Sequence, residues 1–235
     1  MIADPANKAP DRIAGMFDAI APRYDFLNHL LSAGIDRRWR DRAIASLQLT
    51  GRETLLDVCA GTADVALQAR AAARVIGVDF AAAMLKLGLQ KIRGNGQADR
   101  IALVRGDAEH LPVRDGTVDA ATVAFGIRNV QEPARACAEM ARVMRPGARL
   151  AILEFGVPRV PGVSALYLGY FTYVLPAIGK LISGHNAAYA YLPASVGAFP
   201  PPPAFMAVLT RAGFRDVRAD PLTFGVVYLY TAVRS

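Results

Sequence analysis

The feature that most constrains this chain is a repeated unit, in which a short apolar run is followed by a segment with helical periodicity. The first three apolar runs end in an acidic residue, as in ETLLDV, RVIGVD and IALVRGD. Strands and helices that alternate at this spacing indicate a parallel sheet covered by helices on both faces. The five strands that we expect span residues 53–58, 74–79, 101–107, 118–126 and 148–156, and the helices between them span 63–73, 81–93 and 132–144.

The two ends of the chain depart from this alternation of strands and helices. Apolar residues at steps of three or four indicate amphipathic helices in residues 1–50, which Pro22 and Gly34 divide. Residues 51–235 form the main domain, and its alternation breaks over 157–200, which is too long for a bare connection and is expected to be an inserted cap. A further helix at 201–214 and strands at 216–222 and 224–233 complete the domain. The apolar N-terminal stripe consists of Phe17, Ile20, Tyr24, Leu27, Leu31 and Ile35.

Composition excludes several classes of protein. Hydrophobic residues make up 53% of the chain, which is incompatible with disorder. The net charge of +7 is spread along the chain, which favours a solvated surface over nucleic-acid binding. Cys59 and Cys137 are too few for a disulfide framework, and no cluster has the spacing of metal ligands. Without a secretory signal at its start, the sequence predicts a cytoplasmic protein.

Residues 160–179 carry no charge, and no Asp or Glu occurs between Glu154 and Asp216. The uncharged stretch has the length of a membrane span, but prolines and glycines interrupt it. Two other interpretations are the apolar core of the cap and a surface that meets an anionic membrane or a hydrophobic ligand.

Small and acidic residues gather where the predicted strands end, which is where an open α/β sheet binds its ligands. The loop after the first strand, CAGTAD, is small enough for backbone N–H groups to approach a ligand. Asp79 ends the second strand, where a carboxylate accepts hydrogen bonds from a ribose diol, and Asp107 with Ala108 ends the third, near an adenine. Each acid alone is also explained as a helix cap. Because the loop lacks the three glycines of a dinucleotide fingerprint, the pattern favours S-adenosylmethionine over NAD.

At this point the chain resembles the ubiquinone/menaquinone biosynthesis C-methyltransferases. The resemblance is carried by LLDVCAGTAD, VIGVDFAAAMLKLGLQKI, RGDAEHLPVRDGTVDAATVAFGIRNV, MRPGARLAILEF and YAYLPASVGAFP, and by MFDAIAPRYDFLNHLLSAGIDRRWR near the start. It implies an α/β, Rossmann-like class I methyltransferase fold with a seven-stranded, mostly parallel sheet whose last strand is antiparallel. The residues expected at the cofactor are Asp57, Gly61, Thr62, Asp79, Phe80, Asp107, Ala108 and Ala124.

The chain departs from the family pattern at two positions. Ala63 stands where many members have glycine, and its extra methyl group is tolerable only if the residue avoids positive φ. Ala124 stands where relatives have a hydroxyl before Phe-Gly, so only its backbone can serve there.

The chemistry that the resemblance implies requires a quinol ring carbon made nucleophilic by ionisation of a neighbouring hydroxyl. Arg128 is expected to stabilise that quinolate, with Asn129 beside it, and a structural ion pair is the alternative for Arg128. His185 is the candidate proton acceptor, with a surface or packing role as its alternative. No metal is required.

A polyprenylated quinol needs an apolar channel for its tail. Candidate partners also include a membrane surface, which the protein touches peripherally, and a second copy in a homodimer. Two alternatives stay open: a methyltransferase for another hydrophobic molecule such as a sterol, polyketide or lipid, and a non-catalytic scaffold of a biosynthetic complex. The residues expected at the substrate are Tyr24, Asn28, Tyr170, Tyr189 and Tyr191.

Overall fold

The computed structural model describes residues 8–9, 12–21, 32, 34–158, 160, 162, 167, 169 and 186–235. The expected site residues outside this set are Tyr24, Asn28, Tyr170 and His185, and the side chain of Tyr189. Most of the uncharged stretch at 160–179 lies outside it as well. Within the described residues, no helix has both the length and the apolar character needed to cross a bilayer.

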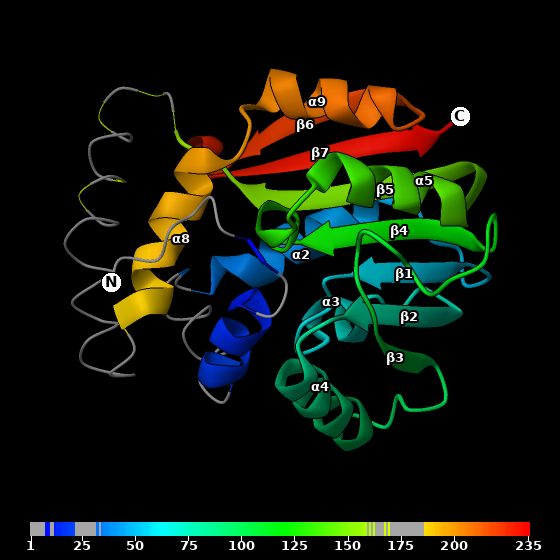
Figure 1. The fold of residues 1–235 in the computed structure, drawn as a ribbon. Coiled ribbons are helices and arrows are strands. Elements are labelled where there is room, and N and C mark those ends of the chain that lie inside the picture. Colours follow the sequence, from blue (N-terminus) through cyan, green and yellow to red (C-terminus); the bar gives the residue numbers. More distant parts are fainter. Residues whose placement is uncertain are drawn as a thin grey trace.

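A seven-stranded sheet in the order β3-β2-β1-β4-β5-β7-β6 forms the centre of the described structure (Figure 1). Strands β1 to β5 pair in parallel, and β7 runs antiparallel to both of its neighbours, as the sequence analysis predicted. The strand order reverses between β1 and β4, so a crevice is expected beyond the carboxyl ends of these strands. The strands are β1 (Thr54–Val58), β2 (Arg74–Asp79), β3 (Ile101–Arg105), β4 (Val118–Ala124), β5 (Met144–Phe155), β6 (Phe214–Leu222) and β7 (Val227–Arg234).

Helices connect the strands as expected, and residues 12–21 form an N-terminal helix. The helix expected over 63–73 is shorter in the structure, where α3 ends at Gln68. The guanidinium of Arg100 accounts for this, since it donates to the carbonyl oxygens of Ala69 and Ala72 and so satisfies the chain where the helix ends. The other elements are α2 (Ile35–Ser46), α3 (Asp64–Gln68), α4 (Ala82–Gly94), α5 (Pro133–Val143), α8 (Asn186–Ala198) and α9 (Pro202–Arg211), with short 3-10 turns η1 (Ile127–Asn129) and η3 (Thr223–Gly225).

Two apolar cores lie on the two faces of the sheet. Met140 of α5 and Phe205 of α9 pack in one core, and Trp39 of α2 packs in the other. Successive residues of β1 divide between them, because side chains alternate across a strand. Ile35, expected on the buried stripe, is 37% exposed because it is the first residue of α2, and the contact with the sheet is made from Trp39 onward.

The fifth strand starts earlier than expected. The sequence RPG indicated a turn before residue 148, yet β5 begins at Met144. The turn is present as an irregularity within the strand: Gly147 has φ 81°, and the register shifts between the pairs Val118–Met144 and Ala120–Arg149. A bulge absorbs the extra residues without ending the pairing.

Three aromatic rings close the sheet where β4 and β5 end. Trp39 packs against Phe125 and Phe155, with ring centroids 6.0 Å and 6.4 Å away. Its indole Nε1 donates to Thr223 Oγ1 at 3.0 Å. This bond ties α2 to the turn between β6 and β7, which are far from it in sequence.

Candidate functional site

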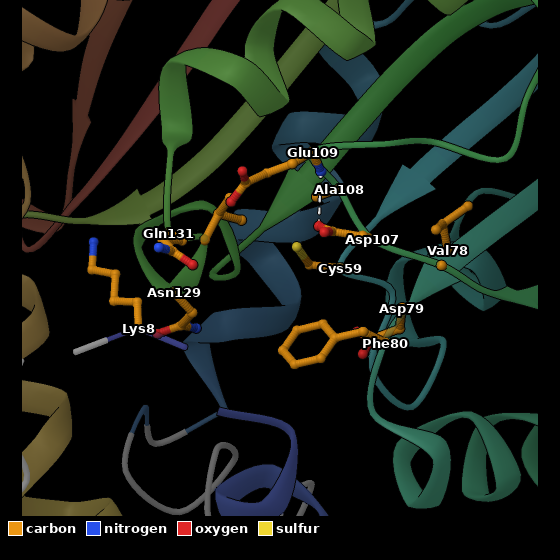
Figure 2. A pocket seen from close by; sticks show the side chains of 12 residues that line it. Lys8, Cys59, Val78, Asp79, Phe80, Asp107, Ala108, Glu109, Asn129 and Gln131 are labelled. Carbon is orange, nitrogen blue, oxygen red and sulfur yellow. Dashed lines mark hydrogen bonds between the residues drawn. The ribbon is translucent and has the colours of Figure 1, made fainter. Parts of the chain in front are cut away.

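Two adjoining cavities lie beyond the carboxyl ends of β1, β2 and β4. Figure 2 shows the Phe80 ring reaching from the end of β2 toward Asn129 on η1, with the Cys59 thiol near both. This is the crevice that the strand order predicts. The residues that line both cavities are Cys59, Asp79, Phe80, Asn129 and Val130.

The loop after β1 takes an unusual backbone path. Cys59, Gly61 and Ala63 have φ values of 57°, 53° and 66°. The condition stated for Ala63 therefore fails, since this alanine adopts the left-handed conformation that its methyl group disfavours. Its side chain is fully buried, and the residue caps α3. The loop consequently holds strain beside the cavity.

Asp79 is the acid that this loop surrounds. Its Oδ2 accepts from the N–H of Gly61 and its Oδ1 from that of Ala81, both at 2.8 Å. Burial raises the pKa of Asp79, and backbone hydrogen bonds oppose that shift. Each carboxylate oxygen has two lone pairs, so both can accept a further bond from a ligand in the cavity.

Asp107 and Ala108 form the adjoining wall. Asp107 Oδ1 accepts from the N–H of Glu109 at 2.9 Å, a local turn that fixes the carboxylate. The side chain of Asp107 is 46% exposed, much more than that of Asp79. Ala124 lines the second cavity, as does Gly61.

Two residues expected at the cofactor do not line either cavity. Asp57 is 1% exposed inside β1, and its Oδ2 has no hydrogen-bond partner in the described structure. Burial, with a contribution from Asp79, raises the pKa of Asp57 to about 8. Thr62 is also buried, and its Oγ1 accepts from Lys91 Nζ at 3.1 Å. Both side chains point into the packing behind the loop.

Arg128 forms a buried ion pair, the alternative considered for it. Its Nη1 donates to Glu154 Oε1 at 2.7 Å and to the carbonyl oxygen of Phe125 at 2.5 Å. Its Nε donates to Ser195 Oγ of α8 at 3.3 Å. The backbone N–H of Arg128 donates to Glu154 Oε2 at 3.1 Å, so Glu154 holds both ends of this residue. Arg128 does not line either cavity.

Asn129, the next residue, faces the cavities. It is 7% exposed, and its Oδ1 has no hydrogen-bond partner among the described residues. A buried amide oxygen without a partner costs free energy, which a ligand donor in the cavity would recover. Tyr191 on α8 is 4% exposed, with its hydroxyl likewise unpartnered, and burial raises its pKa.

Sequence reasoning missed several lining residues. Cys59 and Glu109 lie within the motifs that carried the resemblance, so their position could have indicated them. Nothing in the sequence singled out Lys8, whose pKa burial lowers. The other lining residues that were missed are Phe17, Val78, Ala81, Met84, Gly106, Phe125, Gly126, Val130 and Gln131.

Comparisons with known proteins show the family and the fold of the chain. The ubiE/COQ5 methyltransferase family matches residues 6–234. The ubiquinone/menaquinone biosynthesis C-methyltransferase UbiE of Syntrophotalea carbinolica is 48% identical over 94% of this chain and 93% of its own length. The demethylmenaquinone methyltransferase of Bacteroides fragilis is 40% identical over 97% of this chain and 94% of its own length. A solved structure, a putative S-adenosyl-L-methionine-dependent methyltransferase from Methanococcus maripaludis, has a TM-score of 0.64 at 17% identity, covers 92% of each chain, and supports the fold alone.

Proposed function

Because the chain belongs to the ubiE/COQ5 methyltransferase family, we propose that it transfers a methyl group from S-adenosylmethionine to a ring carbon of a polyprenylated quinol. The observation that carries the proposal is the placement of Asp79. Its carboxylate is anchored by two backbone N–H groups and borders both cavities. The remaining lone pairs accept hydrogen bonds from the two ribose hydroxyls.

The other predicted cofactor contacts follow from the same cavities. Asp107 accepts from the exocyclic amine of adenine, and the Phe80 ring packs on the nucleoside from the end of β2. The lining includes the carboxyl groups of Asp79, Asp107 and Glu109 against the single lysine Lys8. A negative lining suits a ligand that carries a sulfonium charge.

S-adenosylmethionine, when bound, would supply an electrophilic methyl carbon for an ionised quinol ring. Asn129 faces that reaction, and its unpartnered Oδ1 accepts a donor from cofactor or substrate. Arg128 holds η1 in place through its bonds to Glu154, and so it orients Asn129. In this proposal Arg128 is a positioning residue and does not contact the quinolate directly. His185 remains the proposed proton acceptor.

The acceptor that we propose is demethylmenaquinol, and the ubiquinone precursor is the second candidate. The name of the Bacteroides fragilis relative supports the first, and the dual name of the Syntrophotalea carbinolica relative supports both. The proposed substrate contacts are Tyr24, Asn28, Tyr170, Tyr189 and Tyr191. The last two lie on α8, and Tyr191 is buried. The protein works in the cytoplasm, touches the membrane peripherally and pairs as a homodimer in this proposal.

Incubation with S-adenosylmethionine carrying a labelled methyl group, and with demethylmenaquinol or a demethylated benzoquinol, tests the function by mass spectrometry. We expect the label on the ring carbon of the naphthoquinol. Turnover only on an unrelated sterol, polyketide or lipid would replace the proposed acceptor. Cofactor binding without turnover on any acceptor would favour the non-catalytic scaffold.

A further inference from the structure

We propose that Lys91 on α4 is a positioning residue for S-adenosylmethionine, because its ammonium group holds the strained loop after β1 in the form that borders the cavities. The identity of the ligand rests on the proposed function. Within this loop, Cys59 and Gly61 line the cavities. Lys91 reaches the loop through Thr62, whose side chain is buried, and neither Lys91 nor Thr62 lines a cavity. Lys91 therefore acts on the ligand through the loop and not by contact.

The ammonium group of Lys91 bridges the two residues that flank Ala63. Its Nζ donates to Thr62 Oγ1 at 3.1 Å and also to Asp64 Oδ1, with which it forms an ion pair. Because only Ala63 separates Thr62 from Asp64, its backbone angles determine how far apart their side chains lie. A single donor group that reaches both side chains therefore restrains the conformation of Ala63.

That conformation needs a restraint. Ala63 has φ 66° and ψ 26°, in the left-handed region, where the methyl group of an alanine costs free energy. Its N–H donates to the carbonyl oxygen of Ala60 at 2.8 Å, so the loop closes as a tight turn. Relaxation of Ala63 would shift Gly61, whose N–H donates to Asp79 Oδ2. The strain is thus stored next to the group that anchors the proposed ribose contact.

Helix α4 comes close enough to the loop for Lys91 to reach it. A β-carbon on Gly88 would lie 3.3 Å from both the carbonyl carbon of Thr62 and the β-carbon of Ala63, so the absence of a side chain there permits the approach. Lys91 follows Gly88 by three residues and therefore lies on the same face of the helix. The lysine side chain starts from the side of α4 that faces the loop.

Asp64 is shared between two helices. Its Oδ1 pairs with Lys91 on α4, and its Oδ2 lies 3.5 Å from Arg40 Nη2 on α2. Arg40 also pairs with Asp36, and its Nε donates to Gln68 Oε1 at 2.7 Å. Removal of the Lys91 charge therefore leaves Asp64 beside a cation. A variant of Lys91 tests the bridge to Thr62 and Asp64 without creating an isolated buried charge.

Titration calorimetry of the full-length protein with S-adenosylmethionine tests the inference. Lys91→Met keeps an unbranched side chain and removes the donor, and we expect the dissociation constant to rise about tenfold as the strained residue is released. Lys91→Gln, which keeps a donor for one of the two oxygens, should fall between Lys91→Met and wild type. Lys86→Met, at an exposed position of the same helix, is the matched control and should leave the dissociation constant unchanged.

A second substitution separates positioning from packing. Glycine adopts φ 66° without a methyl clash, so a loop with Ala63→Gly keeps its form without the bridge. Lys91→Met combined with Ala63→Gly should therefore bind S-adenosylmethionine within about twofold of wild type, although the lysine is still missing. A loss of affinity that glycine does not restore would assign Lys91 to the packing of α4 and overturn the inference. Equal affinity of Lys91→Met and wild type would overturn it as well.

Hydrogen exchange in the ligand-free protein gives a readout that needs no cofactor. The N–H groups of Gly61 and Ala63 donate to Asp79 Oδ2 and to the carbonyl oxygen of Ala60, and both should exchange about tenfold faster in Lys91→Met. Unchanged exchange of these two amides would overturn the inference. Wild type that does not bind S-adenosylmethionine would defeat the proposed function, and the exchange rates would then decide whether Lys91 holds the loop.

Discussion

The two halves of the crevice hold their acidic residues in different ways. On the side of β2 and β3, Asp79 and Asp107 accept backbone N–H groups from nearby loops and keep lone pairs facing the cavities. On the side of β5, Glu154 is completely buried and is used by Arg128 and the N–H of Phe155. The carboxylates of Asp79 and Asp107 are available to a ligand, whereas that of Glu154 holds Arg128 and the backbone around it in place. Position at a strand end therefore does not by itself make an acid a ligand contact.

The largest effect should come from breaking the buried pair. Glu154→Leu leaves Arg128 charged, buried and without its carboxylate, which should lower the free energy of unfolding by about 3–5 kcal/mol. The double variant Arg128→Met with Glu154→Leu should recover much of this loss, because no charge is left buried. Chemical denaturation measures both. A single variant as stable as wild type would contradict the assignment of this side as structural.

The next largest effect tests the ligand-facing side. Asp79→Asn should weaken S-adenosylmethionine binding by about 2–3 kcal/mol, the value of hydrogen bonds to a charged group. Asp107→Asn should weaken it less, because that side chain is 46% exposed and its bonds compete with water. Titration calorimetry measures the two dissociation constants. The reverse ranking would show that the adenine side dominates recognition.

Asp57 provides a pH test on the first side. Its pKa is raised from 3.8 to about 8, so the folded protein holds the proton more tightly than the unfolded chain does. The stability from that proton is fully present below pH 4 and is lost as the pH rises through 8. Relative to wild type, Asp57→Asn should therefore gain stability as the pH rises across this window. Unfolding curves across the window measure the difference.

An exposed acid gives the control for this experiment. Asp99→Asn removes an exposed carboxylate and is measured in parallel as the control. If the Asp57→Asn difference is flat from pH 4 to 8, Asp57 is ionised in the fold and does not belong to the buried set.

The smallest effect concerns the loop that supplies Gly61. Ala63→Gly should raise the free energy of unfolding by about 1 kcal/mol at most, because glycine adopts φ 66° without a methyl clash. Ala45→Gly on the exposed face of α2 should instead lower it by about 1 kcal/mol. Thermal unfolding of the two variants gives the comparison, and a loss of stability in both would show that the loop is not strained.

Local periodicity located the parallel strands and the acids at their ends, whereas the antiparallel last strand followed from the resemblance to the family. It missed the early end of α3 because the donor that satisfies its carbonyl oxygens is Arg100, some thirty residues away. Asp57 and Asp79 both end apolar runs, and only the direction of each side chain from its strand separates a buried acid from one that borders a cavity. Lys8 could not be found at all, since its place depends on how the N-terminal chain folds back.

The guanidinium of Arg128 touches three separate parts of the chain at once: the end of β5, the loop after β4 and α8. Moving α8 away from η1 would break the contact with Ser195 and admit water to the pair with Glu154. Opening this part of the protein would therefore also disturb the position of Asn129, which is the next residue in the chain. A movement of α8 and the position of Asn129 are therefore thermodynamically linked through a single side chain.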